Sequence, residues 1–275
     1  DFIDRIGLAK ADSTVDLALL EHCVREDLGG KARRAMAVVH PLKVVLQNWP
    51  EDRAEELEME NHPDHPEWGT HKVVLTREIY IEQEDFMEVP VKKYFRMFPG
   101  NEVRLKGAYI VRCDGCEKDE DGNVTAVLCT VDMDTRNGTE GANRKVKGTL
   151  HWVSASENIP FEARLYEPLM MKETEEETAA EAAQSEAEAK AEADGEENVV
   201  SSATLKTDFL KKLNPNSLEV CHGYLSKALG EANVGDTYQF LRVGYFCKDQ
   251  DSTPEMPVFN RVVGLKDTFA KQVKA

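Results

Sequence analysis

The chain has 275 residues, of which 41% are hydrophobic, and a formal net charge of −17 at pH 7. This length fits about two domains of ordinary size, and the hydrophobic share is enough to fill their cores. No run approaches the ~20 apolar residues of a membrane span, and the first residues alternate acids and bases instead of forming a signal-peptide core, so we expect a cytoplasmic protein that does not engage membranes.

The first residues predict two helices. FIDRIGL predicts a short helix, and its abrupt apolar start at Phe2 indicates a piece cut from a longer protein. In the segment 13–28 the apolar residues recur at helical spacing behind a predicted N-cap at Ser13. These residues are Leu17, Leu20, Val24 and Leu28.

From Ala35 onward the pattern changes to β-branched and aromatic runs separated by turn signals. Short strands at this spacing are typical of a barrel or a sandwich, and we expect a barrel that ends near Glu167. Strand-like runs resume with SLEVCHGYL, TYQFLRVGYFCKD and PVFNRVVGL. VRLKGAYIV and FLRVGYFC share a base shortly before a Gly and a Tyr just after it, which hints at a duplicated barrel.

Most of the acidity lies between these two β regions. Residues 173–197 hold eleven acids and one lysine, a net of −10, which leaves −7 of the total −17 for the rest of the chain. The Glu/Ala composition fits either a disordered spacer or a solvated helix over about 174–193. The total charge therefore says little about the surface that meets a partner.

A basic block stands out at residues 92–112, with six Lys or Arg against one Glu and several aromatic side chains. If this block forms two strands, Arg104 and Lys106 point to the same face, a row that suits phosphates or base edges. Gly107 would let a backbone approach closely. The alternative is an ordinary solvated strand face.

Two further sets of polar residues favour binding over a solvated face. Lys31, Arg33 and Arg34 lie where the helical part meets the first strand, and Gln239 with Arg242 lies in the second β region. Cations and amides spread over separate pockets suit the splayed bases of a single-stranded RNA loop better than a regular duplex.

Two clusters of possible metal ligands are weaker signals. CDGC at 113–116, with Cys129 opposite on a hairpin, lacks the fourth ligand of a structural zinc site, and the remaining cysteines are scattered as expected of reduced thiols. The segment NHPDHPEWGTH at 61–71 offers three imidazoles and Asp64, but its two prolines and glycine predict a loop that projects toward a ligand. We assign no metal. No catalytic motif occurs either, so no catalytic residue is assigned.

The sequence resembles a known family over nearly its whole length outside the acidic segment. The similar stretches are REDLGGKARRAMAVVHPLKVVLQN, NHPDHPEWGT, KYFRMFPGNEVRLKGAYIV, RKVKGTLHWVSA and MPVFNRVVGLKDT. They resemble the C-terminal half of bacterial glutaminyl-tRNA synthetases. The family's His-Ile-Gly-His-type and Lys-Met-Ser-Lys-type signatures do not occur here, so we expect a fragment that lacks the catalytic domain.

The resemblance implies a mainly β fold with a small N-terminal helical segment and two consecutive β-barrels, proximal and distal. Four parts follow: a helical stem segment at 1–33, a first anticodon-binding barrel at 34–168, the acidic insert at 169–200, and a second barrel region at 201–275. The implied partner is the anticodon loop of glutamine tRNA, with no DNA, and the chain is expected to be a monomer. ATP and magnesium would serve the full-length ligase, and the fragment itself would hold no cofactor.

The resemblance also implies which residues contact the anticodon. These residues are Arg34, Lys93, Arg96, Arg104, Lys106, Gln239, Arg242 and Thr268. Four positions depart from the family pattern: Lys93 stands where Gln is common, Lys106 where Arg is common, and Asp64 and Gly29 where Asn is common. Lys106 can hold a phosphate but lacks the planar fork of a guanidinium group.

Two alternative functions remain open at this point. A glutamyl-tRNA synthetase of the archaeal and eukaryotic kind shares the barrel arrangement, although the HWVSA run favours the glutamine enzyme. A non-catalytic scaffold protein that recruits a partner through the acidic helix belongs to another class.

Overall fold

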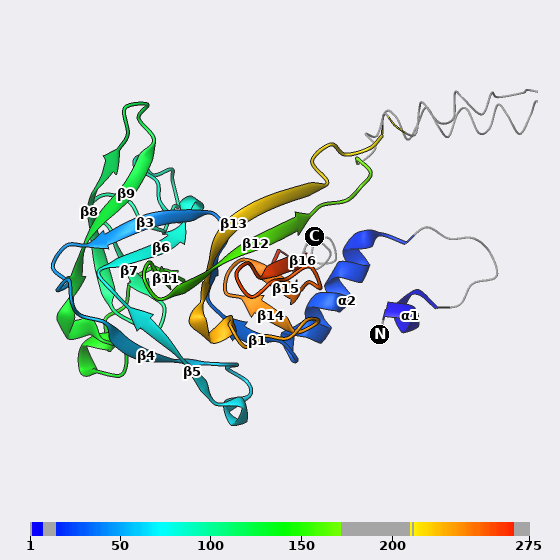
Figure 1. Cartoon of the computed structure of the whole chain (residues 1–275), viewed down its shortest axis with the longest axis horizontal. Coiled ribbons are helices and arrows are strands. Elements are labelled where there is room, and N and C mark those ends of the chain that lie inside the picture. Colours follow the sequence, from blue (N-terminus) through cyan, green and yellow to red (C-terminus); the bar gives the residue numbers. More distant parts are fainter. Residues whose placement is uncertain (1, 8–14, 172–209, 211, 267–275) are drawn as a thin grey trace, which may run out of the picture. The chain divides into compact units, whose positions relative to one another are not determined.

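The computed structural model describes residues 2–7, 15–171, 210 and 212–266. The protein is mainly β-structure, built around two curled sheets with few helices (Figure 1). The sequence predicted two barrels, and the structure confirms the coarser arrangement of two curled sheets, each with two edge strands. Thr268, the greater part of the acidic insert and its predicted helix lie outside the described residues.

The two predicted helices are present as α1 (Phe2–Ile6) and α2 (Leu17–Gly29). The cap differs from the prediction, because Asp16 caps α2 through a side-chain oxygen that accepts from the backbone N–H of Ala18 at 2.9 Å. Ser13 lies outside the described residues. Either residue has the short polar side chain that an N-cap needs, so spacing alone could not choose between them. Short 3-10 turns occur at Pro66–Trp68, Gln83–Asp85, Met133–Thr135, Glu140–Asn143 and Lys227–Leu229.

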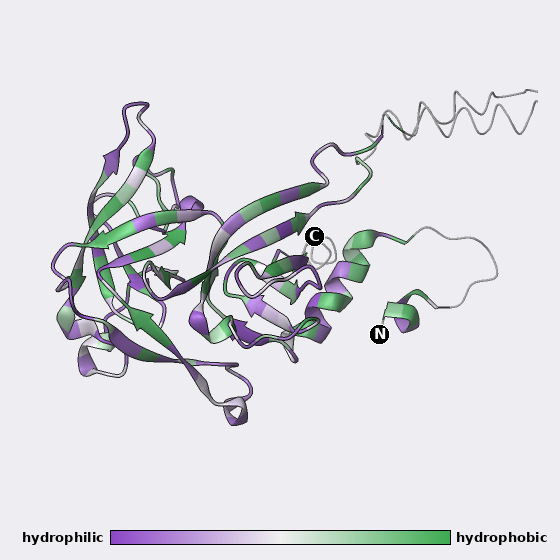
Figure 2. Cartoon of the chain, viewed as in Figure 1, coloured by the Kyte–Doolittle hydropathy of each residue, from purple (hydrophilic) through white to green (hydrophobic). Residues whose placement is uncertain are grey.

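The first sheet holds most of the strands predicted before residue 155. Its order is β10-β7-β8-β9-β3-β6-β11. The bounds are β3 (Pro41–Leu46), β6 (Glu78–Glu82), β7 (Glu102–Leu105), β8 (Ile110–Lys118), β9 (Val124–Asp132), β10 (Gly148–Leu150) and β11 (Val153–Ser154). Buried and less buried residues alternate along β3, and Figure 2 shows hydrophobic and hydrophilic residues interleaved along the strands. This period of two is why the sequence revealed these strands.

The second sheet joins segments from the whole length of the chain. Its order is β1-β14-β15-β16-β12-β13-β2. The bounds are β1 (Arg33–Ala35), β2 (Ala37–Val38), β12 (Asn158–Tyr166), β13 (Leu218–Ser226), β14 (Thr237–Phe240), β15 (Gly244–Lys248) and β16 (Val258–Gly264). Thus β1, β2 and β12, which the sequence placed in the first barrel, pair in the second sheet. The four-part domain division stays a prediction.

One strand pair was not predicted in full. The strands β4 (Glu55–Glu60) and β5 (Thr70–Leu75) form a separate antiparallel ladder with Glu58 opposite Lys72. The sequence of β4 is EELEME, and only Leu57 and Met59 are buried in it. Four acids in six residues hide the β pattern, because glutamate is rare in strands.

Aromatic side chains pack in the core of the second sheet and connect the two sheets. In the second sheet Phe240 stacks on Phe246 with ring centroids 4.4 Å apart, and Phe161 meets Phe240 edge-on at 5.9 Å. Between the sheets Tyr80 of β6 stacks on Tyr224 of β13 at 4.4 Å. Aromatic pairs of this kind add about 0.5–1.5 kcal/mol beyond the area they bury. The two sheets therefore share a packed contact.

The helix α2 packs against the second sheet. Val24 and Leu28 contact the buried cluster that contains Tyr245 and Val263. The Arg25 guanidinium group also donates to the carbonyl oxygen of Gly264 at 2.7 Å. The packing of α2 on this sheet also holds the start of β1 near the helix, because only a few residues separate the end of α2 from Arg33.

Two compact units divide the chain. One contains the residues up to Arg164 together with those from Val220 onward, and the other lies between Leu165 and Glu219. In the second unit Met170 and Leu213 form an antiparallel bridge, and Asn214 donates its backbone N–H to Leu169 at 2.7 Å. None of the helices in the described ranges has the length and apolar character required to span a bilayer.

Candidate nucleic-acid interface

Two arginines from different sheets meet on one buried carboxylate, Asp85. Arg242, in the turn after β14, donates both ends of its guanidinium group to the two Asp85 oxygens at 2.7 and 2.6 Å. Arg96, in the loop before β7, lies 3.2 Å from the same carboxylate. The Asp85 side chain is fully buried, whereas the Arg242 side chain is 31% exposed and that of Arg96 is 36% exposed. Asp85 therefore holds two cations whose side chains remain partly exposed to solvent.

The residues around Arg96 restrain its position further. Arg96 also contacts the carboxylate of Glu84 at 2.8 Å and donates to the Glu84 carbonyl oxygen at 3.1 Å. Tyr94 donates its hydroxyl to that carbonyl at 3.0 Å. Burial, with a further contribution from the negative charge of Asp85, raises the pKa of Tyr94 to about 12. The phenol is therefore neutral at physiological pH and remains a hydrogen-bond donor.

Arg34 and Gln239 lie side by side on neighbouring strands. The parallel pairing of β1 with β14 places Arg34 opposite Gln239, and β15 places Tyr245 opposite Gln239. Register partners point to the same face of a sheet, so these three side chains form one row. The Nε atom of Arg34 is buried and has no hydrogen-bond partner among the described residues. A buried donor of this kind is costly unless a partner is supplied.

One short segment of the chain carries both Gln239, which lies beside Arg34, and Arg242, which pairs with Asp85. The two residues are three positions apart, at the end of β14 and in the turn after it, and Leu241 in that turn donates its backbone N–H to the carbonyl oxygen of Ala35 in β1. The backbone of Arg242 has a φ of +66°, a conformation that costs a non-glycine residue free energy. We call Arg34, Arg96, Gln239 and Arg242 the central group.

Arg104 has a different role in the free protein. Its guanidinium group donates to the backbone carbonyls of Ala142 at 2.7 Å, Arg144 at 3.1 Å and Thr135 at 3.4 Å. Burial and the nearby Arg144 lower the pKa of Arg104. Arg104 thus holds the segment between β9 and β10 in place through three hydrogen bonds. None of these bonds involves a residue of the central group.

The strand predicted to carry both Arg104 and Lys106 ends at Leu105, so Lys106 lies one residue beyond β7 and the row of two cations stays a prediction. Lys106 lies in the turn to β8, is exposed, and precedes Gly107 with a φ of +71°. The space beside Gly107 is also filled from within, since a Cβ there would lie 2.1 Å from the sulfur atom of Met59. The Met59 side chain therefore occupies the space beside Gly107 that was predicted to receive the backbone of a ligand.

The remaining part of the basic block is a loop rather than a strand. Lys93 is exposed and has a φ of +70°, which belongs to a turn. The structure thus brings four residues of the predicted site together in two pairs, Arg96 with Arg242 and Arg34 with Gln239, while no contact of Arg104, Lys106 or Lys93 with these pairs is found among the described residues. Thr268 lies outside the described residues.

The histidine-rich segment folds on itself as a loop. His65 stacks on Trp68 with ring centroids 4.3 Å apart, and His71 shares a 2.8 Å hydrogen bond with Asn61. His62 is buried and bonds through Nε2 to the carbonyl oxygen of Gly29 at 2.8 Å. His62 thus connects the loop to the end of α2, and contacts within the segment account for His65 and His71.

The cysteine pair that the sequence places on a hairpin is confirmed. Cys113 of β8 lies directly opposite Cys129 of β9, and both are buried and reduced. The Cys129 thiol contacts the sulfur of Met97 at 3.7 Å. Cys116 lies farther along β8, beyond a β-bulge. The thiols therefore contribute to the core of the first sheet.

Sequence reasoning missed Asp85, which organises the central group. The chain has 51 acidic residues, and nothing in the segment IEQEDFM distinguishes Asp85 from the acids beside it. Asp85 differs from the exposed Glu84 beside it in being buried, and its burial results from the 3-10 turn after β6.

A mainly β fold that pairs Arg96 with Arg242 on one carboxylate and sets Arg34 beside Gln239 has the features of a nucleic-acid-binding module. Two family models match this chain, at residues 32–132 and 149–249, and both are described as "tRNA synthetases class I (E and Q), anti-codon binding domain". The chain belongs to this family of anticodon-binding domains.

Similar curated proteins include three bacterial proteins called glutamine–tRNA ligase. The one from Clostridium perfringens is 48% identical over 270 residues, which covers 98% of this chain and 44% of the relative. Those from Bradyrhizobium diazoefficiens and Nitrobacter hamburgensis are 45% and 46% identical, cover 99% and 100% of this chain, and are matched over 44% of their own length. The chain therefore spans less than half the length of these relatives.

Proposed function

We propose that this chain is the C-terminal anticodon-binding part of a glutamine–tRNA ligase and that it reads the anticodon loop of glutamine tRNA. One observation carries the proposal: Asp85 gathers Arg96 and Arg242 from loops next to two different sheets and leaves both side chains partly exposed. Fixed guanidinium groups offer planar donor patterns that suit unstacked bases. The relatives' shared name favours glutamine over glutamate.

The free protein already uses part of the donor capacity of the central group. A guanidinium group has five N–H donors, and Arg242 gives two of its nitrogens to Asp85. The remaining donors of Arg242 and Arg96, the guanidinium group of Arg34 and the amide of Gln239 would contact anticodon bases. We assign Lys93, Arg104, Lys106 and Thr268 to the same function on the family resemblance, with the lysines as phosphate contacts.

The longer protein would join glutamine to its tRNA with ATP and magnesium. Those groups would bind outside this chain, and the chain itself would bind and orient the anticodon end of the tRNA. The division into a helical stem segment, two barrels and an acidic insert belongs to the same proposal, as does a monomeric, cytoplasmic state.

The test compares RNAs that differ only in the anticodon. Binding of the 275-residue chain to glutamine tRNA and to the same tRNA with a swapped anticodon is measured by fluorescence anisotropy. We expect the swap to weaken binding at least tenfold, since each lost bidentate contact costs about 1–3 kcal/mol by analogy with groove readout. Arg242→Gln should remove most of that preference.

The matched control is Lys118→Gln. Lys118 lies at the end of β8, its ammonium group pairs with Glu88, and no RNA contact is assigned to it. It should leave the preference unchanged. Equal affinity of the unaltered chain for both tRNAs would contradict base readout. No binding to either tRNA would favour a scaffold function instead.

A further inference from the structure

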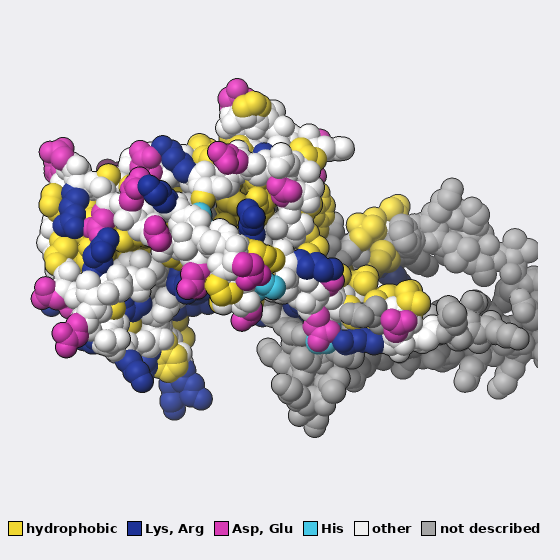
Figure 3. Space-filling model, turned by 90° about the horizontal axis from the view of Figure 1, so that it is seen from below, with side chains coloured by type: hydrophobic (Ala, Val, Ile, Leu, Met, Phe, Trp, Pro, Cys, Tyr) yellow, Lys and Arg dark blue, Asp and Glu magenta, His cyan; other side chains and the backbone are white. Residues whose placement is uncertain are grey.

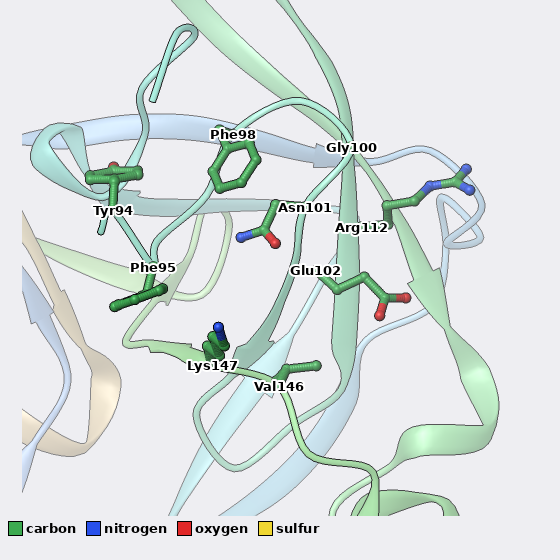
Figure 4. A pocket seen from close by; sticks show the side chains of 9 residues that line it. All are labelled: Tyr94, Phe95, Phe98, Gly100, Asn101, Glu102, Arg112, Val146 and Lys147. Carbon is green, nitrogen blue, oxygen red and sulfur yellow. The ribbon is translucent and has the colours of Figure 1, made fainter. Parts of the chain in front are cut away.

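A pocket next to Arg96 has no role in the function proposed so far. Its volume is roughly 510 Å³, and it lies between the loop that carries Arg96, the start of β7 and the segment before β10. Pockets of about 300–1,000 Å³ are typical of small-ligand sites, so this one has room for a nucleoside. Figure 4 shows its lining, of which the argument uses Phe95, Phe98, Asn101, Glu102 and Lys147.

The pocket presents an aromatic ring with a cation over one of its faces. Phe95 is 49% exposed, and the Lys147 ammonium group lies over its ring, 5.0 Å from the centroid. Within the ranges that the structure covers, Lys147 pairs with no carboxylate. A base can stack on the remaining exposed surface of such a ring, while the cation meets the phosphate.

The polar groups of the pocket point to one chemical class of base. Asn101 donates its amide nitrogen to the carbonyl oxygen of Arg96 at 2.7 Å, which fixes the amide and leaves its oxygen as an acceptor. Figure 4 shows this amide between Phe98 and Lys147. Glu102, which accepts from Arg144 at 2.5 Å, also offers only acceptor atoms when ionised. Acceptors select a ligand that donates, such as a base with an exocyclic amino group.

The unpaired charge of the pocket decides where a phosphate binds. Glu102 is already neutralised by Arg144, so Lys147 is the group that meets a phosphate, and a neutral base can occupy the space between Phe95 and Asn101. The ligand therefore combines an apolar face, a donor edge and a single negative charge at the outside. These are the properties of one nucleotide in a single-stranded segment.

We propose that this pocket binds one nucleotide of the anticodon loop outside the anticodon itself, with an adenine, cytosine or guanine base. The base stacks on Phe95 and donates its amino group to Asn101, and Lys147 pairs with the phosphate. The inference rests on the proposed function, because Arg96 and the pocket are joined through Asn101. It adds a contact that widens recognition beyond the three anticodon bases.

A double-mutant cycle between protein and RNA tests this contact. The RNAs are glutamine anticodon stem-loops in which each loop nucleotide outside the anticodon is replaced, one at a time, by an abasic nucleotide. We expect one abasic position to weaken binding of the unaltered chain about tenfold and to have no further effect on Phe95→Ala. Tyr166→Ala is the matched control, because Tyr166 is also an exposed aromatic residue, at 48%; it should respond to every abasic position as the unaltered chain does.

A second measurement tests the class of base. At the position found in the cycle, uridine should bind about threefold more weakly than cytidine in the unaltered chain, because uracil lacks the amino group. Asn101→Ala should remove that preference. Thermal unfolding of each variant establishes that it folds, and Phe95→Leu, which keeps an apolar side chain without the flat ring, repeats the cycle if Phe95→Ala does not fold.

The outcomes separate the two proposals. One outcome is that the unaltered chain binds the stem-loop, and each abasic position weakens binding of the unaltered chain and of the Phe95 variants by the same factor. The proposed pocket contact is then wrong, while anticodon binding stands. If cytidine and uridine bind equally, the assignment of an amino-bearing base is wrong. If the unaltered chain does not bind the stem-loop at all, both proposals fail.

Discussion

At the scale of single residues, Asp85 holds two arginines of the central group in position. Its carboxylate is fully buried and receives Arg242 through two hydrogen bonds and Arg96 through one contact. A buried acid costs free energy on its own, and here two positive charges offset that cost. The arginines were predictable because cations near aromatic runs are typical of RNA-binding surfaces. Asp85 was not, because only tertiary packing distinguishes it from exposed acids.

Asp85→Asn should destabilise the protein and loosen both arginines. The amide keeps the shape of the side chain but removes the negative charge, which leaves two guanidinium groups around a neutral partner. We expect the free energy of unfolding to fall by about 3–5 kcal/mol, as for other buried pairs that lose one partner. Urea unfolding measures the change, and affinity for glutamine tRNA should fall with it.

Glu88→Gln is the matched control for this prediction, since Glu88 pairs with Lys118 through side chains that are 49% and 38% exposed. An exposed pair contributes at most about 1 kcal/mol. If both variants unfold at the same urea concentration, Asp85 does not organise the central group.

At the scale of elements, the turn between β7 and β8 shows what a strand pattern predicts and what it leaves open. Both strands were predicted from their alternating residues, and both are present. The pattern did not show that β7 ends at Leu105 and that Lys106 and Gly107 belong to the turn. Strand ends depend on hydrogen-bond partners in neighbouring segments of the chain, here the bond from the Lys106 N–H to the Leu150 carbonyl.

Gly107→Ala should be more destabilising than a substitution at another glycine of the same backbone type. Gly107 has a φ of +71°, and a Cβ there would overlap the Met59 sulfur, whereas Gly100 has a φ of +84° with open space around it. Gly100→Ala should therefore cost only the backbone strain, about 1–2 kcal/mol. Gly107→Ala adds the displacement of a buried methionine, so we expect a further 1–3 kcal/mol.

Denaturant unfolding checks this prediction, and Met59→Ala completes the cycle. In the Met59→Ala background the extra cost of Gly107→Ala should disappear, which leaves only the strain. An unchanged cost in that background would show that Met59 is not the limiting neighbour.

For the whole molecule, an acidic chain binds RNA only where its cations gather locally. On the face shown in Figure 3, basic and acidic side chains are interspersed and form no continuous basic patch. Much of the formal charge of −17 comes from residues 173–197, so the total charge does not describe the interface. Recognition would then depend on a few fixed contacts more than on a broad electrostatic field.

The affinity for glutamine tRNA should still fall as salt rises, because every phosphate contact releases counterions. Lys106→Gln should reduce the slope of log affinity against log salt by roughly 0.7 to 1, if Lys106 contacts one phosphate. Lys118→Gln should leave the slope unchanged, since that ammonium group already pairs with Glu88. Titrations at several salt concentrations provide the measurement, and an affinity independent of salt would exclude phosphate contacts.

The sequence by itself determined the β-rich fold class, the two regions of strands, the α2 helix and most of the cations of the central group. Local patterns are enough for these features, because side-chain periodicity and residue chemistry are properties of short segments. Only the tertiary structure decided that β1 pairs with β14, that Arg34 therefore lies beside Gln239, and that Asp85 holds Arg96 and Arg242 together. These contacts join segments far apart in the chain, and their pairing depends on how the whole core packs rather than on any one stretch of sequence.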